Sequence, residues 1–86
     1  MKIARTERFN KAWKRLTKGE KSLARKAVTN LAADMRYTAL RVKKIKGVNN
    51  IWEARISLNL RITFQIEKDV ILLRNIGHHD ETLSRP

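Results

Sequence analysis

The chain has 86 residues, of which 42% are hydrophobic, and a net charge of +12; this length fits one domain, residues 1–86. The absence of cysteine excludes disulfides, thiolate metal sites and a cysteine nucleophile, and no apolar run approaches the roughly 20 residues of a membrane span. No membrane partner is expected, and because the first residues lack an apolar secretory signal, the expected location is the cytoplasm.

Two helices are predicted after residues 1–5, which suit a short edge strand. Thr6 is the expected N-cap of the first helix, whose apolar face carries Phe9, Ala12, Trp13 and Leu16. Thr17 and Glu20 have capping-box spacing and open the second helix, with an apolar stripe of Leu23, Ala24, Ala27, Val28, Leu31 and Met35. Because the connection is short, the two helices should form an antiparallel hairpin.

The second half of the chain has the period of strands. Residues 37–47 read as a loop leading into an irregular strand with a basic patch of Lys43, Lys44 and Lys46. Apolar and polar residues alternate over 51–56 and 60–67, and 70–77 is nearly continuously apolar. The predicted fold class is therefore α+β, with the helix hairpin packed on one face of a 3–4-stranded antiparallel sheet.

Hairpin registers follow from keeping the apolar patterns in phase. A three-residue loop over 57–59 pairs Arg55 with Arg61 and puts Asn59 in the left-handed conformation. A two-residue loop at 68–69 in the next hairpin puts Thr63 opposite Arg74. Opposed arginines repel unless something neutralises them, and the exposed polar face should carry Glu53, Arg55, Arg61, Thr63, Gln65 and Arg74.

Positive charge is concentrated in the first half: residues 1–50 hold 15 Lys/Arg and 3 Asp/Glu, whereas residues 51–86 hold 5 of each. Such a field attracts nucleic acid or an acidic protein. The alternative is that these lysines only keep a surface soluble, and that the polar sheet face is an ordinary Glu–Arg network in solvent.

The tail from Gly77 follows the last strand directly and should lie near Arg61. Cleaving RNA needs a base, an acid and cations for the charge on phosphorus, which His79, Glu53 and the arginines can supply. A metal site over 78–81 is not expected, because adjacent residues on an extended chain point opposite ways. No cofactor and no helix after the last strand are expected.

The segment LRVKKIKGVNNIWEARISLNLRITFQIEKDVILLRNIGHHDETL resembles RelE/ParE superfamily toxins of type II toxin–antitoxin systems, including the RelE, YafQ and YoeB mRNA interferases. Shared features are a Leu-x-Gly turn, a Trp/Tyr strand, a Tyr-Arg strand and a closing strand ending in Gly-x-His or Gly-x-Arg. With the helices before it, the resemblance covers nearly the whole chain. It implies an antiparallel sheet packed on two N-terminal helices.

By this resemblance Arg61 contacts the scissile phosphate, Arg55 and Glu53 hold basic or acid/base positions, and His79 holds the position of a catalytic His or Arg. The resemblance also implies a surface that binds RNA phosphates, with Lys43, Lys44, Lys46, Arg74 and His78. Two departures stand out: Leu60 replaces a usual Tyr or His, and Leu83 or Arg85 replaces a C-terminal aromatic. They argue against RelE-like, ribosome-dependent activity more than against a YafQ-like histidine mechanism.

The expected function is a metal-independent endoribonuclease toxin that cleaves mRNA, at the ribosome in many members, and inhibits translation. Its expected partners are an acidic antitoxin, mRNA, the ribosome, and operator DNA through the antitoxin. One alternative is a ParE-like inhibitor of DNA gyrase without nuclease activity. The other is an inactive relative that binds only antitoxin and operator DNA.

Overall fold

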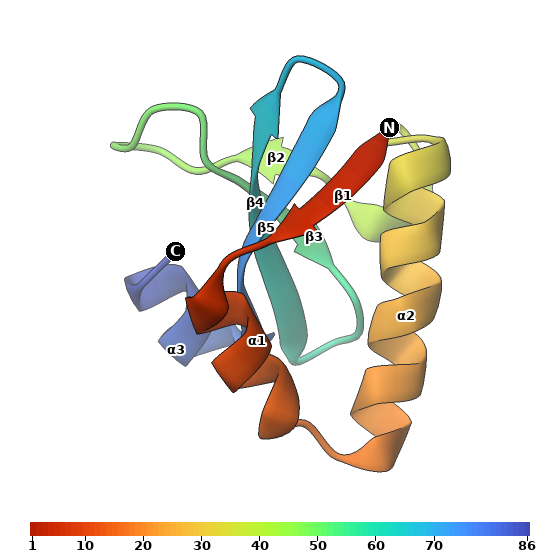
Figure 1. Cartoon of the computed structure of the whole chain (residues 1–86). Coiled ribbons are helices and arrows are strands. Elements are labelled where there is room, and N and C mark those ends of the chain that lie inside the picture. Colours follow the sequence, from red (N-terminus) through yellow and green to blue (C-terminus); the bar gives the residue numbers. More distant parts are fainter.

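The computed structural model describes all 86 residues as a sheet with helices on both of its faces (Figure 1). The sheet has five strands in the order β1-β5-β4-β3-β2. In chain order the elements are β1 (Lys2–Arg5), α1 (Glu7–Lys14), α2 (Lys18–Ala33), a 3₁₀ turn (Thr38–Leu40), β2 (Lys43–Lys44), β3 (Trp52–Arg55), β4 (Leu60–Glu67), β5 (Val70–His78) and α3 (His79–Ser84). No helix is long and apolar enough to cross a membrane.

The α+β class is confirmed, but the strand count and the sheet type differ from the prediction. The sheet has five strands instead of three or four, and it is mixed, because β1 pairs in parallel with β5 while all other pairs are antiparallel. A parallel neighbour requires a long crossover, here the whole intervening chain. Four residues of alternation cannot reveal which distant strand they join.

Both predicted helix caps are present. The Thr6 hydroxyl accepts a hydrogen bond from the Phe9 amide at 3.0 Å. The Thr17 hydroxyl accepts from the Glu20 amide at 3.1 Å, and the Glu20 carboxylate accepts from the Thr17 amide at 2.9 Å, completing the capping box. These caps fix where α1 and α2 begin, and the two helices run in opposite directions over the same sheet face (Figure 1).

The core lies between these two helices and the apolar face of the sheet. Its fully buried residues include Phe9 of α1, Leu31 of α2 and Phe64 of β4. Leu23 was expected on the buried stripe but is 49% exposed. The buried positions of α2 are Ala24, Ala27 and Leu31. They form a narrow stripe at spacings of three and four, and Leu23 lies outside this stripe and faces solvent.

The first strand hairpin has the predicted register, with Arg55 opposite Arg61, but its loop differs in detail. Asn59 is not left-handed; the only non-glycine residues with positive φ are Arg41, Asn50 and Lys68. The Arg61 guanidinium instead donates to the carbonyls of Ser57 (2.7 Å) and Leu58 (3.1 Å). The Arg61 side chain thus stabilises the loop through its backbone carbonyls, without a left-handed residue at Asn59.

The second hairpin starts in the predicted register, with Glu67 opposite Val70, and then shifts. A bulge on β5, opposite the step from Thr63 to Phe64 of β4, leaves Arg74 unpaired, so that Asn75, and not Arg74, lies opposite Thr63. A bulge inserts one residue into one strand and re-aims its side chain. The alternation pattern alone does not reveal it, because the residues before it, 70–73, are apolar on both faces.

The tail is helical, contrary to the expectation. Helix α3 begins at His79, directly after β5, and packs against β4 and β5. Its Thr82 is buried, and this close approach depends on Gly77 of β5 having no side chain. Helix α3 therefore covers the part of the sheet face away from α1 and α2 that β4 and β5 form beside it, which positions the candidate site next to α3.

Candidate functional site

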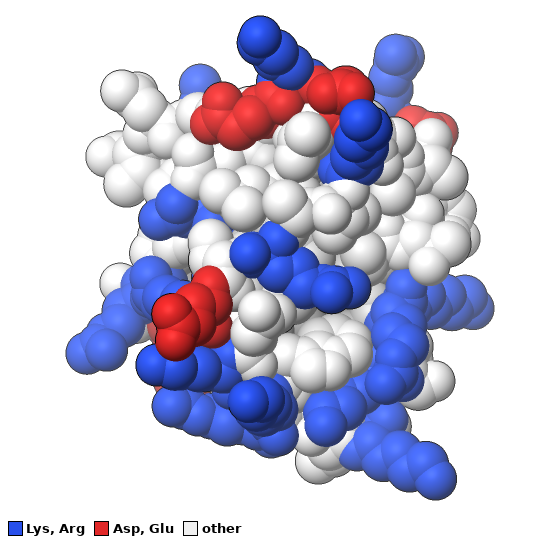
Figure 2. Space-filling view, viewed as in Figure 1, with Lys and Arg blue, Asp and Glu red and all other residues white.

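Basic residues occur on both sides of the molecule. Figure 2 shows Lys and Arg gathered over α1 and α2 and at the edge next to α3, with acidic residues mainly at the top of the view, around the β4–β5 turn, and a smaller acidic patch beside α1. Most residues that the sequence singled out lie on the opposite side of the sheet. We define the polar sheet face as the side chains of β2, β3 and β4 directed away from α1 and α2: Lys43, Glu53, Arg55, Arg61, Thr63 and Gln65.

Arg55 and Arg61 are direct cross-strand neighbours on this face. Neither forms an ion pair with any acidic side chain, and Arg61 donates only to backbone carbonyls, those of Ser57, Leu58 and Leu60. Like charges directly opposite each other destabilise a sheet. The pair therefore constitutes an uncompensated positive site at the hairpin end of the face, suited to an anion such as phosphate.

Glu53 lies one row further along the same face, opposite Thr63. Its side chain is only 10% exposed, and it pairs with the exposed ammonium group of Lys43 at 3.8 Å. This carboxylate therefore pairs with Lys43 and not with Arg55, its neighbour two residues along β3, so that both arginines lack an acidic partner.

Arg55 and Arg61 form a row across the strands. Along the strand direction, Glu53 lies on one side of this row and His79 lies on the other. The backbone amide of His79 donates to the Asn59 carbonyl at 2.8 Å, which holds the start of α3 against the hairpin that carries Arg61. Its half-exposed imidazole places Nδ1 3.0 Å from a carboxylate oxygen of Asp80. Asp80 was not identified as a partner of His79 from the sequence, because neighbours on a strand diverge; the helical turn that begins here brings them together.

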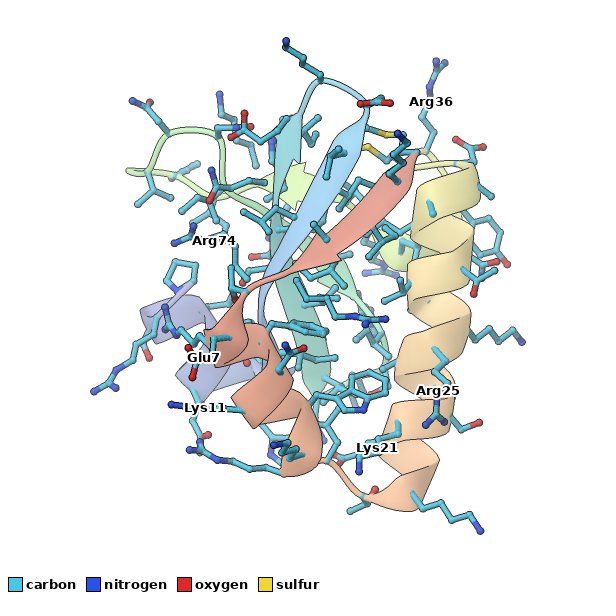
Figure 3. The ribbon with its side chains drawn as sticks, viewed as in Figure 1. Glu7, Lys11, Lys21, Arg25, Arg36 and Arg74 are labelled. Atoms are coloured by element: carbon cyan, nitrogen blue, oxygen red, sulfur yellow. The ribbon has the colours of Figure 1, made fainter.

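The side chain of Arg74, on the bulge of β5, already forms hydrogen bonds within the protein. Its Nε donates to the Pro86 carbonyl at 3.1 Å, a carbonyl that also accepts from the buried Thr63 hydroxyl at 3.0 Å. Arg74 also donates to the side-chain oxygen of Gln65. In Figure 3 Arg74 extends from β5 on the same side of the molecule as α3. The segment after α3 therefore covers this part of the polar sheet face.

Three of the predicted site residues lie elsewhere. Lys44 points to the helix side, where its ammonium lies 5.9 Å from the centre of the Trp52 ring. Lys46 lies in the turn after β2. His78 also faces the helix side, where its Nε2 lies 3.2 Å from a Glu20 carboxylate oxygen. Along a strand, adjacent residues alternate between faces, so His78 and His79 cannot serve one site together.

The pKa of the Glu20 carboxyl departs clearly from its ordinary value. The backbone hydrogen bond from Thr17, followed by the side-chain hydrogen bond with His78, lowers the pKa of the Glu20 carboxyl. The lowered pKa keeps the Glu20 carboxylate negatively charged in the first turn of α2, where the helix dipole favours negative charge. No group of three or more metal-binding side chains converges anywhere in the chain.

Comparison with solved structures finds the same fold in known toxins. RelE in the RelB–RelE complex of Methanococcus jannaschii is 21% identical, with a TM-score of 0.78 over 96% of this chain and 99% of that one. YafQ of Escherichia coli is 12% identical, with 0.78 over 93% and 94%. A metal-bound toxin of Helicobacter pylori is 27% identical, with 0.76 over 94% and 97%. No protein-family model and no curated protein sequence matches the chain.

These likenesses extend over nearly the full length of each chain compared, and they confirm the resemblance drawn from the sequence at the level of the fold. The chain has the fold of the RelE and YafQ toxins. At such identities the likeness concerns the backbone, so the assignment of chemistry depends on the polar sheet face.

Proposed function

We propose that the chain is the toxin of a type II toxin–antitoxin system and acts as a metal-independent endoribonuclease on mRNA. The observation that carries this proposal is the opposed pair Arg55 and Arg61, which has no acidic partner and lies beside an exposed histidine. A sheet tolerates such a pair at a cost in stability. A bound phosphodiester would remove that cost.

The proposed reaction is attack of a ribose 2′-hydroxyl on the adjacent phosphorus, with release of the 5′-oxygen. Base and acid must then act from opposite sides of the phosphorus. Glu53 and His79 flank the arginine row along the strand direction, one on each side. Arg61 and Arg55 stabilise the charge that develops on the phosphoryl oxygens, Asp80 orients the His79 ring, and Lys43 pairs with Glu53.

The proposed partners follow from charge and from the comparisons. RelE of M. jannaschii was crystallised with the antitoxin RelB, and a net charge of +12 favours acidic partners. We expect a cognate acidic antitoxin that also carries the complex to operator DNA. We expect the same charge to direct the free toxin to mRNA on the ribosome.

The test is induction of the wild type, Arg61→Ala and His79→Ala in a bacterial host, with primer extension on a reporter mRNA. Arg36→Ala is the matched control, because Arg36 points away from the molecule in Figure 3. We expect growth arrest with mRNA cleavage for the wild type and the control only. Arrest without cleavage would favour gyrase inhibition, and no arrest would favour an inactive relative that binds antitoxin and operator DNA.

A further inference from the structure

A second basic site lies outside the polar sheet face, in a cavity of about 650 Å³ between α1, the end of β5 and α3. Its charged lining comes from four elements and is mainly cationic: Arg8, Lys11 and Arg15 of α1 and its cap, His78 of β5, Glu20 of α2, and Glu81 and Arg85 of α3 and its end. Few apolar residues line it. An apolar ligand or an amphipathic helix bound here would remove water from these charges without pairing them, which is unfavourable.

The α1 cations are arranged at spacings of three and four, so Arg8, Lys11 and Arg15 project from one side of the helix. Figure 3 shows Lys11, with Glu7, on the side of α1 next to α3. Only Lys11 has an acidic partner, Glu7 at 3.6 Å on the open surface. Arg8 bonds to the backbone carbonyl of Arg85. Stacked like charges weaken a helix, so the row is unfavourable without an anion.

The two carboxylates of the cavity do not neutralise the α1 arginines. Glu20 accepts the Thr17 amide with one oxygen and lies against His78 with the other. Glu81 forms no ion pair. Four permanent cations thus face two carboxylates, one of which is already occupied. The excess positive charge matches a phosphate group, whose oxygens fit arginine hydrogen-bond geometry.

We infer that this cavity binds a backbone phosphate of single-stranded RNA, upstream or downstream of the cleaved bond. The inference rests on the proposed RNA-cleaving function. It is favoured by position, because Gly77 lies opposite Arg61 in the sheet and also lines the cavity. An RNA chain held at Arg61 and His79 can pass the first turn of α3 and reach α1.

The test compares two variants with equal charge loss. Arg8→Gln/Arg15→Gln removes cavity cations, and Lys14→Gln/Lys18→Gln removes two exposed lysines of α1 and α2 that do not line it. Binding of a 2′-O-methyl RNA decamer, which cannot be cleaved, is measured by anisotropy over a salt series. Circular dichroism and thermal melting establish that both variants fold.

We expect the cavity variant to bind about tenfold more weakly and its log–log salt slope to fall by about 0.7 per lost phosphate contact. The control should change much less. Equal losses in both variants would overturn the inference, because a diffuse positive field would then explain the binding. Unchanged binding by the cavity variant would overturn it as well.

A second arm titrates the full chain with inorganic phosphate and follows amide chemical shifts by NMR. We expect saturable shifts at Gly77 and His78, which line the cavity and are unchanged in the variant, and we expect the cavity variant to lose these shifts. Phosphate binding without decamer binding would overturn RNA as the ligand and assign the cavity to a small phosphate compound. Cleavage by the wild type, tested separately with Arg61→Ala, decides the proposed function whatever the cavity does.

Discussion

A Cβ atom at Gly77 would lie 2.9 Å from the hydroxyl oxygen of Thr82. Real side chains essentially never approach so closely, so β5 and α3 can pack only if residue 77 is glycine. Since Thr82 is 1% exposed, it cannot simply turn away into solvent. This contact places His79, at the start of α3, beside the hairpin that carries Arg61.

Gly77→Ala should displace α3 and destabilise the fold by about 2 kcal/mol, the usual effect of overpacking. Chemical denaturation measures the loss, and RNA cleavage should fall with it because His79 moves. Gly19→Ala is the matched control: nothing lies within 4 Å of a Cβ there, and alanine suits a helix better than glycine. Equal stability of the two variants would contradict the packing role of Gly77.

Arg55→Gln should raise the free energy of unfolding while abolishing cleavage. Removing one of two opposed cations relieves a repulsion of roughly 0.2–1 kcal/mol, but it also removes a charge proposed to bind phosphate. Urea denaturation and an RNA cleavage assay measure the two effects, with Arg36→Gln as the control. A loss of both stability and activity would mean that Arg55 is needed for the sheet itself.

Thr63→Val should destabilise the fold by about 1 kcal/mol. The Thr63 hydroxyl is fully buried on the polar sheet face and donates to the Pro86 carbonyl at 3.0 Å. Valine keeps the shape and loses only this bond. Thr29→Val tests the same change on an exposed helix position, where the hydroxyl bonds to the Arg25 carbonyl, and should alter stability much less.

Acid should weaken the start of α2 through Glu20. The pKa of this carboxyl is lowered from its usual 4.5 by the Thr17 backbone bond and then by His78. A depressed folded-state pKa gives stability that is fully present above the unfolded-state pKa and lost as pH falls through the folded value. Melting temperatures between pH 6 and about pH 3 should therefore fall more steeply for the wild type than for Glu20→Gln.

The control for this pH dependence is Glu7→Gln. Glu7 also lies in the first turn of a helix, but it pairs with Lys11 on the open surface, where ion pairs contribute little. Its melting profile against pH should follow that of the wild type. A profile for Glu20→Gln that is parallel to the wild type would show that the capping carboxylate does not couple acid to stability.

Local sequence patterns were sufficient to predict the helix caps, the register of the first hairpin and the distribution of charge. The caps at Thr6 and Thr17 need only residues three positions away, and the pairing of Arg55 with Arg61 follows from alternation and a short loop. The charge excess of the first half likewise needs no fold. Each of these features depends on neighbours along the chain, so the sequence carries it directly.

Tertiary structure alone decided the rest, because those features join residues far apart in the chain. The parallel pairing of β1 with β5, the bulge that re-aims Arg74 and the helix α3 over the polar sheet face all arise from packing between distant segments. The same packing directs His78 to Glu20 and His79 to Asp80. Two adjacent histidines that look equivalent in the sequence thus serve different sides of the sheet.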